Sequence, residues 1–455
     1  MAHRILLSLP NGWSIRNMIY TGIVDQLAQT CEVIIIVPEH FRVGLLEKVK
    51  VENVIVETFK PRPEPLSWRL LRQLRKKVFL EVNHIETELI KERAQRRELY
   101  QRAGGVLLRY ISRLPMSKNL ITITEAADFL VNRDRLYADM IERHHPTLVV
   151  GTTPFEYREE SLFRAAMRQG IPCVCFIPSW DNLSSKGVIN QRFRRLLVWN
   201  EVMRDEILSG YPEYRAERVK VVGIPQFDVY CVPPSLNYEA WCQQYALDPN
   251  RHTILYSTAP PRLFQYDPVI VERIVEGINS GHLPRDIQVL VRCHPWDSAA
   301  RYEHLRSKGT VGICGSSTST GGTADHWVPP IDELLILRDC MAFSVMNINV
   351  ASTMSIDAAV CGKPVLNIAF DGDEELPYER SSRRFYDYSH YKRVVASGAV
   401  HICHSYDELF QGIIDYLDNP QLDSEKRSAL VEMMCPFNDG KSSQRCVTEL
   451  FNCIE

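Results

Sequence analysis

The sequence predicts an α/β protein built from two doubly wound, parallel-sheet domains. Its 455 residues exceed one ordinary hydrophobic core, and the usual domain size favours two domains of roughly 200 residues each. Both halves alternate short β-branched runs with stretches of helical periodicity, which is typical of βαβ units. Pro233 and Pro234 interrupt regular structure between the halves. We therefore expect domains at residues 1–232 and 233–455.

The expected strands of the first half are short apolar runs, and the expected helices have an apolar stripe with a polar remainder. Strands are expected at residues 5–9, 33–37, 54–58, 148–150, 173–177 and 197–199. Helices are expected at residues 16–29, 126–143, 159–169 and 201–208. This alternation favours a Rossmann-like sheet with helices on both faces.

The second half repeats the pattern. Strands are expected at residues 253–257, 288–292, 341–345, 364–370 and 400–403. Residues 309–325 are rich in Gly, Ser and Thr, and we expect a flexible loop there because a P-loop lysine and its spacing are missing. Ligands of doubly wound sheets bind at the carboxyl ends of the strands, so we expect the functional residues there.

A helical insertion at about residues 66–118 interrupts the first domain. It is rich in basic residues, which are Arg69, Arg72, Arg75, Lys76, Lys77, Arg93, Arg96, Arg97, Arg102 and Arg109. One interpretation is a solvated helical face. The other is a basic surface that contacts anionic lipid headgroups or an anionic acceptor.

Composition excludes several classes of protein. A formal net charge of −3 gives no electrostatic footprint for nucleic acid. The 13 cysteines include no Cys-x-x-Cys pair, and six of them lie in or beside apolar runs, so we expect reduced core thiols and neither disulfides nor zinc. We find neither a signal sequence nor 18 consecutive apolar residues, so a cytoplasmic enzyme is expected.

The segment from Ala351 to Pro364 carries the strongest motif. It follows one expected strand and precedes another, so Ser352 or Thr353 is expected to cap a helix whose N–H groups point at an anion. Asp357 lies one turn further on, and Gly362 is placed to end the helix. An ordinary capped helix without a ligand is the alternative.

Three segments of the second half together resemble a known superfamily. The pattern Ser-Thr-x-Ser-x-Asp-Ala-x-x-x-Gly-Lys-Pro at residues 352–364 resembles the donor-phosphate motif of GT-B transferases. These are the transferases related to CDP-glycerol glycerophosphotransferases and nonhydrolysing nucleotide-sugar 2-epimerases. Residues 291–295 resemble their Arg-x-His-Pro turn, and residues 328–335 their base-side loop. The resemblance implies a GT-B fold, in which two Rossmann-like domains face each other across a cleft.

The first half resembles bacterial surface-carbohydrate transferases at residues 179–187, 198–200 and 222–228. On the donor side, the resemblance implies that Ser352, Thr353 and Ser355 hold the diphosphate. It implies that Asp357 meets the ribose, where relatives often carry Glu. His294 is expected to donate to phosphate or to stabilise the leaving group, the alternative being a purely structural His-Pro turn. The donor-binding set is completed by Ser257, Arg292 and Val328.

On the acceptor side, the chemistry needs a group that deprotonates a hydroxyl, and Asp181 is the first candidate for this base. It lies in a dense polar cluster, although an Asx-turn explains that cluster equally well. The expected acceptor-binding residues are Trp180, Asn182 and Lys186 around Asp181, and Asn11, Trp13, Arg16 and Asn17 after the first strand.

We expect a glycosyltransferase that moves a sugar from a nucleotide-activated donor to a hydroxyl of a glycan or lipid-linked acceptor. The alternatives are a CDP-polyol phosphotransferase and a nonhydrolysing 2-epimerase. A non-catalytic scaffold is disfavoured because both halves have polar strand-end loops. The expected partners are the donor, the acceptor and, peripherally, the anionic inner face of the cytoplasmic membrane; no nucleic acid is expected. No segment of the expected donor site resembles an Asp-x-Asp metal motif, so we expect no metal ion and no cofactor besides the donor substrate.

Overall fold

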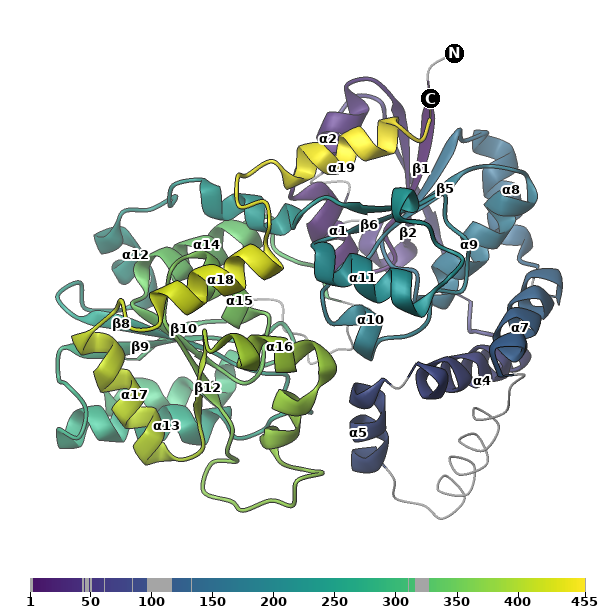
Figure 1. Ribbon diagram of the computed structural model, residues 1–455. Coiled ribbons are helices and arrows are strands. Elements are labelled where there is room, and N and C mark those ends of the chain that lie inside the picture. The colour runs from purple at the N-terminus through teal and green to yellow at the C-terminus, as the bar shows by residue number, and fades with distance from the viewer. Residues whose placement is uncertain are drawn as a thin grey trace. The chain divides into compact units, whose positions relative to one another are not determined.

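The computed structural model describes residues 3–42, 45, 49, 51–60, 62–83, 85–95, 117–131, 133–309, 311–315 and 327–454. The chain forms two compact units, one of Met1–Pro225 with Lys441–Glu455 and one of Gln226–Gly440. The division falls at Pro225, earlier than the expected boundary at residue 232, and the C-terminal segment returns to the first unit. There α19 (Ser442–Phe451) packs against α2 (Ile23–Ala28) (Figure 1).

The first unit contains a seven-stranded sheet in the order β3-β2-β1-β4-β5-β6-β7, with all neighbours parallel. Its strands are β1 (Arg4–Ser8), β2 (Glu32–Pro38), β3 (Val54–Phe59), β4 (Leu148–Gly151), β5 (Cys173–Phe176), β6 (Arg195–Val198) and β7 (Val219–Val221). Its helices include α1 (Gly12–Ile19), α2, α8 (Arg135–His144), α9 (Tyr157–Arg168), α10 (Asn182–Ser185) and α11 (Glu201–Gly210). The strand order reverses between β1 and β4, as doubly wound folds require.

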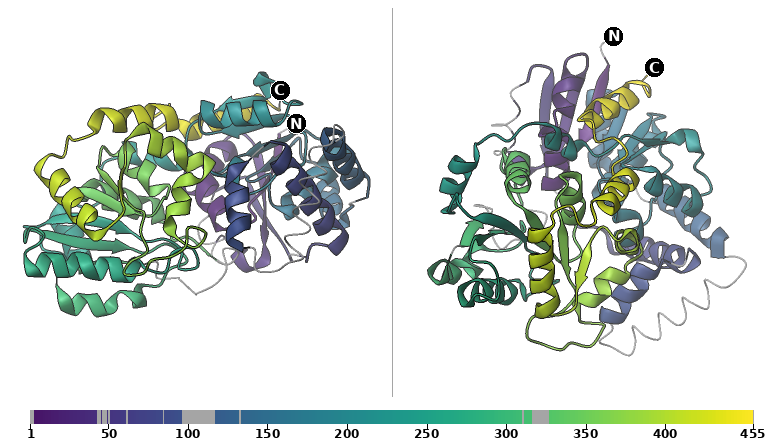
Figure 2. Two further views of the ribbon diagram at one scale, coloured as in Figure 1. Left: turned by 60° about the horizontal axis from the view of Figure 1, so that its bottom comes forward. Right: turned by 60° about the vertical axis from the view of Figure 1, so that its left-hand side comes forward.

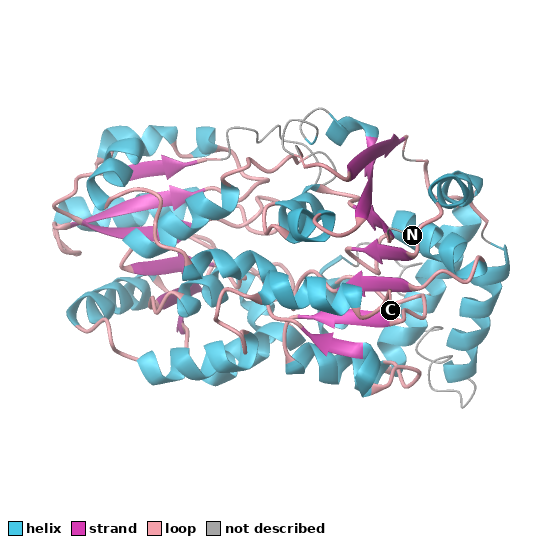
Figure 3. Cartoon of the chain, turned by 90° about the horizontal axis from the view of Figure 1, so that it is seen from above, coloured by secondary structure: helices cyan, strands magenta, loops and turns pink. Residues whose placement is uncertain are grey.

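The second unit has the same topology in a six-stranded parallel sheet of order β10-β9-β8-β11-β12-β13. The strands are β8 (His252–Ser257), β9 (Ile287–Arg292), β10 (Val311–Cys314), β11 (Met346–Asn349), β12 (Val365–Ile368) and β13 (His401–Cys403). The helices are α12 (Tyr238–Tyr245), α13 (Asp267–Ser280), α14 (Glu333–Phe343), α15 (Met354–Val360), α16 (Ser389–Ser397), α17 (Tyr406–Asp418) and α18 (Ser424–Met434). Figure 3 shows helices on both faces of each sheet. Each unit is thus Rossmann-like, and the fold is of the GT-B type.

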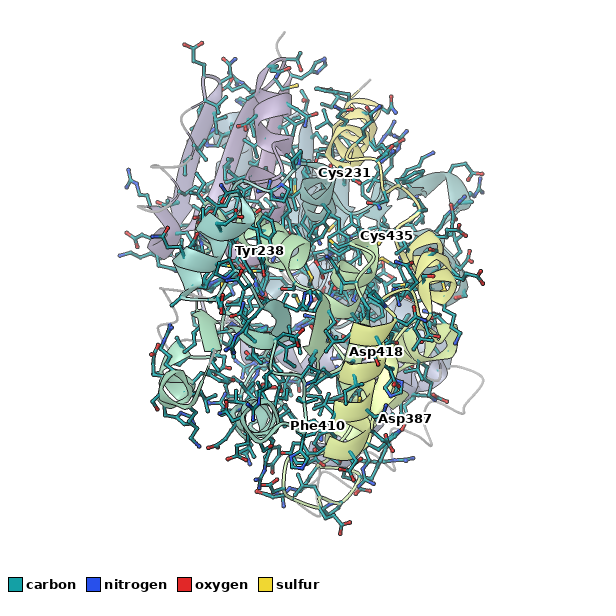
Figure 4. The ribbon with its side chains drawn as sticks, turned by 90° about the vertical axis from the view of Figure 1, so that its left-hand side faces the viewer. Cys231, Tyr238, Asp387, Phe410, Asp418 and Cys435 are labelled. Atoms are coloured by element: carbon teal, nitrogen blue, oxygen red, sulfur yellow. The ribbon has the colours of Figure 1, made fainter. Side chains whose placement is uncertain are left out.

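Close packing of α13 against α17 shows how the second core is built. Phe410, labelled in Figure 4, lies near the middle of α17. Its ring covers Gly277 of α13. A Cβ atom at Gly277 would lie 2.9 Å from the Phe410 ring, so a larger residue there would have to displace this ring. The thiols behave as expected: all 13 cysteines are free, and only Cys231 and Cys361 are not fully buried.

Several element predictions were wrong. Residues 341–345 are mostly the end of α14, because Cys340 and Met341 continue its buried face, and the strand begins at Met346. Strands β7 and β10 were missed; β10 lies inside the expected loop at 309–325, of which residues 316–326 lie outside the described chain. The expected helix at 16–29 is divided at Gly22, whose φ of +74° is left-handed. The expected helix at 126–143 covers the end of α7 (Ser117–Val131) and most of α8.

The described part of the insertion contains α4 (Leu66–Val82), α5 (Glu86–Gln95) and the start of α7, and α4 packs against α7 (Figure 2). Arg96, Arg97, Arg102 and Arg109 lie outside the described residues. Much of the basic charge on α4 is neutralised within the unit. Arg72 donates two 2.8 Å hydrogen bonds to Glu64, and Arg75 is only 2% exposed. None of the described helices has the length and apolar character needed to cross a membrane.

Candidate active site

The expected donor residues of the second unit gather where the order of its strands reverses. Strands β8, β9 and β11 end at Ser257, Arg292 and Asn349. In the pairing register, Ser257 lies opposite Arg292 on one side and opposite Asn349 on the other. The 352–357 segment follows directly after β11. The structure therefore brings Ser257, Arg292 and the start of α15 to one edge of the sheet, which is where doubly wound folds bind ligands.

The loop between β11 and α15 has a strained and well-fixed backbone. Ala351 has a φ of +38°, which is unusual for a residue with a side chain. The N–H of Ser352 donates to Asn349 Oδ1 (3.1 Å), that of Met354 to Ser352 Oγ (3.3 Å), and that of Ser355 to the Ser352 carbonyl (3.1 Å). These N–H groups, which were expected to face the diphosphate, thus have protein acceptors. Within the described residues the Ser352 hydroxyl accepts the Met354 N–H and donates to no protein group, so its proton can be donated to a phosphate oxygen.

Ser355 lies in a buried polar network that the sequence analysis missed. Its side chain is 0% exposed, and its hydroxyl lies 2.8 Å from Tyr391 Oη and 3.2 Å from Asn367 Nδ2. Asn349 contacts the same hydroxyl and also accepts the Ser352 N–H. The network therefore fixes the start of the loop. Its one visible signal was asparagine at 347 and 349 in an apolar strand, because strands are depleted of asparagine.

Asp357 is held by the segment that enters the second unit. It is 3% exposed and accepts a 2.5 Å hydrogen bond from the Tyr230 hydroxyl in η3 (Pro225–Cys231). Burial, and then the neighbouring Asp357 carboxylate, raise the pKa of Tyr230 well above its usual value. Tyr230 therefore remains a hydrogen-bond donor. A ribose hydroxyl at Asp357 would have to share the carboxylate with it.

His294 is placed to donate a hydrogen bond from a neutral imidazole. Its pKa is lowered to about 3, first by burial and then by the Arg292 charge, so the imidazole is neutral at neutral pH. Nδ1 accepts the Trp296 N–H at 3.1 Å, which leaves the proton on Nε2. This is the form suited to donating to a phosphate or leaving group.

Arg292, the last residue of β9, connects this strand to the expected base-side loop. Its guanidinium forms a 2.5 Å ion pair with Glu333, the first residue of α14. The Glu333 N–H donates to the Pro330 carbonyl, and half-buried Val328 lies two residues before that proline. The ion pair thus fixes the loop that carries Val328 beside the end of β9.

In the first unit, the four expected residues after β1 surround the start of α1. Asn11 caps the helix, since its Oδ1 accepts the Ser14 N–H at 3.0 Å. The Arg16 guanidinium stacks over the Trp13 ring at 4.7 Å and donates to Asn17. Asn11 thus has a structural role, while Trp13, Arg16 and Asn17 form one cluster.

Beside this cluster lies a buried carboxyl that the sequence analysis did not select. Glu159 is 1% exposed and accepts the N–H groups of Thr152 (3.1 Å) and Thr153 (2.7 Å), directly after β4. The Thr152 hydroxyl donates to Ser14 (2.7 Å), which connects the loop to α1. Burial raises the pKa of Glu159 to about 8, although the two N–H groups oppose this. A glutamate on an amphipathic helix gives no sequence signal of such burial.

Asp181 lies in a polar turn after β5. Its carboxylate accepts hydrogen bonds from Ser179 (2.5 Å), Asn182 (3.0 Å) and Ser185 (2.8 Å). Trp180 and Asn182 are buried, so of the three expected neighbours only Lys186 has an exposed side chain. The turn orients Asp181 firmly, as both the catalytic and the structural interpretation require.

The insertion is fastened to this turn. Lys91 of α5 donates to the Ser185 carbonyl (2.9 Å), and Lys76 of α4 donates to the Lys186 carbonyl (3.1 Å). Burial is the main cause of the lowered pKa of Lys91, and Asp181 is among the anions that oppose it. Two basic residues of the insertion therefore position the Asp181 turn. Among the described residues, no group of three or more His, Cys, Asp or Glu side chains is arranged to hold a metal ion.

Comparison by sequence gives one family. Residues 189–452, more than half of the chain, match the family described as CDP-Glycerol:Poly(glycerophosphate) glycerophosphotransferase. The matched region includes the whole β8–β13 sheet and the segment 352–357. A search of curated proteins finds no match.

Comparison by structure gives the fold. The UDP-GlcNAc 2-epimerase from Neisseria meningitidis bound to UDP-GlcNAc has a TM-score of 0.55 at 13% identity, over 99% of this chain and 100% of that one. The UDP-GlcNAc 2-epimerase from Methanocaldococcus jannaschii in complex with UDP-GlcNAc and UDP has a TM-score of 0.53 at 12% identity, over 99% of both chains. A glycosyltransferase from Rickettsia africae has a TM-score of 0.51 at 11% identity, over 99% and 98%. At these identities the likeness establishes the GT-B fold alone.

Proposed function

Since the chain belongs to the CDP-glycerol:poly(glycerophosphate) glycerophosphotransferase family, we propose that it transfers a polyol phosphate from a CDP-activated donor to an acceptor hydroxyl. It is a GT-B-type transferase. The observation that carries the proposal is that the family match spans the complete donor edge of the second sheet, from Ser257 to the segment 352–357. The sequence analysis put a sugar first, and the family match now favours its phosphotransferase alternative.

In the proposed reaction the acceptor oxygen attacks the β-phosphorus of the donor. A phosphorus–oxygen bond forms to the acceptor, the bond to the bridging oxygen breaks, and CMP leaves with that oxygen. The Ser352 and Thr353 hydroxyls hold the diphosphate, and the neutral Nε2–H of His294 donates to the oxygen on which negative charge develops. These roles are supported by the positions of the groups at one sheet edge.

The acceptor's proton passes to Asp181 in this proposal. Its carboxylate is oriented by Ser179, Asn182 and Ser185, as a general base must be. We further propose that the acceptor is a glycan or lipid-linked chain at the inner face of the cytoplasmic membrane, where the enzyme is bound peripherally. Trp13 and Arg16 offer an aromatic and a cationic surface to such an acceptor.

Product analysis tests the proposal. The chain is incubated with CDP-glycerol or UDP-GlcNAc and a polyol-phosphate or glycan acceptor, and the released nucleotide is measured. Polyol-phosphate transfer releases CMP, whereas sugar transfer, the second candidate, releases a nucleoside diphosphate. Epimerisation changes the donor sugar without needing an acceptor. Acceptor-dependent release of UDP with no release of CMP would contradict the proposal.

A further inference from the structure

Helix α4 has two different faces. Its inner face contains the buried residues Arg75, Val78 and Phe79. Its outer face carries Leu66, Leu70 and Leu74, which are 66%, 58% and 36% exposed. Their spacing of four residues aligns them in one stripe along the helix. The stripe therefore cannot be explained by packing within the first unit.

The neighbouring helix α7 also exposes apolar side chains. Ile123 and Leu130 are 60% and 68% exposed, and Phe129 is 36% exposed. The two helices run antiparallel, because Arg62 before α4 pairs with Asp134 after α7, and Arg75 pairs with Asp128. Six of the seven exposed large hydrophobic side chains among the described residues of the first unit lie on these two helices. Such concentration marks an interaction surface, whereas single exposed apolar residues do not.

The exposed charges beside the stripe are cationic. Arg69 and Lys77 are exposed on the same outer face of α4, and Arg133 is exposed just after α7. Among the described residues of both helices, no acidic side chain reaches the exposed class. Arg69 pairs with Glu64, whose side chain is only 7% exposed, so the exposed charge beside the leucines is cationic. Leucines flanked by exposed cations are complementary to a bilayer surface that carries anionic headgroups.

We propose that the outer face of α4, with its leucine stripe and flanking cations, inserts into the interface of an anionic lipid bilayer. This deepens the peripheral contact in the proposed function and rests on it for the nature of the acceptor. From the sequence we expected a contact made by basic residues. Here the leucines provide the main contact, because Arg72 is paired with Glu64 and Arg75 is buried. Helix α4 also holds the Asp181 turn through Lys76, so the bilayer contact lies on the same element as the support of the proposed base.

The test measures sedimentation of the full chain with vesicles of phosphatidylcholine alone and of phosphatidylcholine with phosphatidylglycerol. The wild type is expected to bind the anionic vesicles more tightly. Leu70→Glu should lower binding at least roughly tenfold, the scale for burying one leucine. Lys77→Ala should lower it about fivefold at low salt and not at all at high salt. Leu263→Glu, at a 48% exposed leucine of the second unit, is the matched control and should bind like the wild type.

Three results would overturn the proposal: no binding of the wild type to either vesicle, equal binding by Leu70→Glu and Leu263→Glu, or self-association that Leu70→Glu abolishes without any vesicle binding. The last would assign the face to a second copy of the chain. Circular dichroism of each variant excludes misfolding as the cause. Because the assay contains neither donor nor acceptor, its failure is distinct from failure of the transfer assay.

Discussion

At the end of β11 in the second unit, Asn349 and Ser355 are surrounded by neutral amide and hydroxyl groups. At the end of β4 in the first unit, the loop N–H groups instead face the carboxyl of Glu159. Both positions are the points where the strand order reverses, so topology gives each unit the same opportunity to bind a ligand. The chemistry placed there is what separates them.

The difference indicates a division of labour. The carboxyl groups near the second edge include Asp357, Glu333 and Asp267, and each is bound to a donor of the protein. The donors are Tyr230, Arg292 and Tyr256. Hydroxyl and imidazole donors there can therefore face an anion without a competing bare carboxylate. The first unit has Asp181 after β5 and Glu159 after β4, and the proposed transfer requires a proton acceptor. A diphosphate suits the second edge, and an acceptor hydroxyl suits the first.

The largest expected effect concerns the proton acceptor. Asp181→Asn preserves the shape of the turn but removes the base, so turnover should fall by about 10²–10⁴-fold. Donor affinity, measured by calorimetry, should stay nearly unchanged because the donor edge belongs to the other unit. Ser179→Ala, which removes one hydrogen bond to the carboxylate, should have a much smaller effect. Turnover of Asp181→Asn close to the wild type would leave Asp181 with the structural role of an Asx-turn.

The raised pKa of the buried Glu159 carboxyl can be tested through the pH dependence of the free energy of unfolding. Its folded pKa of about 8 lies above the ordinary value of 4.5, so the stability from its protonated form is complete below pH 4.5 and is lost as pH rises to 8. Relative to Glu159→Gln, the wild type should lose on the order of a few kcal/mol of unfolding free energy over this range. Asp267 also has a raised pKa, so urea titrations of both proteins are compared at each pH. A constant difference would show that Glu159 does not titrate there.

The donor edge is tested by affinity. Ser352→Ala or Thr353→Ala should each weaken nucleotide binding by roughly ten- to a hundredfold, because each removes a hydrogen bond to a charged phosphate. Asp357→Ala should have a similar effect through the ribose. Isothermal titration with the donor nucleotide measures all three, and Ser428→Ala, at an exposed serine of α18, is the control. Unchanged affinity in the three variants would remove the donor site from this edge.

Sequence patterns predicted the parallel sheets well because each strand is a local apolar run. They failed where a choice depended on distant residues. The last residues of α14 have the composition of a strand, and only their packing makes them helical. The return of α19 to the first unit is equally invisible, since an amphipathic helix does not show which sheet it covers.

The candidate site shows the same limit. The motif at 352–357 follows a strand and begins a helix, as predicted, because capping residues and the glycine that ends the helix are local signals. It did not show that Ser355 contacts Tyr391 in a buried network or that Tyr230 donates a hydrogen bond to Asp357. Tyr391 and Tyr230 are both far from the motif in sequence. Burial of Glu159 likewise depends on Ser14 and Thr152, which come from two other segments.

The smallest expected effect is that of a chelator on turnover. This experiment tests most directly whether the sheet edge of the second unit binds the diphosphate without a cation. If fixed donors at the second edge stabilise the diphosphate, EDTA should leave turnover unchanged. Those donors are the hydroxyls of Ser352 and Thr353 and the Nε2–H of His294, which burial keeps neutral and protonated on that nitrogen. Initial rates of nucleotide release are compared with EDTA, with added Mg²⁺ and after Mg²⁺ is restored. Loss of turnover in EDTA that Mg²⁺ reverses would mean that a cation neutralises the diphosphate. The amide and hydroxyl network around Asn349 would then have only the structural role of fixing the loop between β11 and α15.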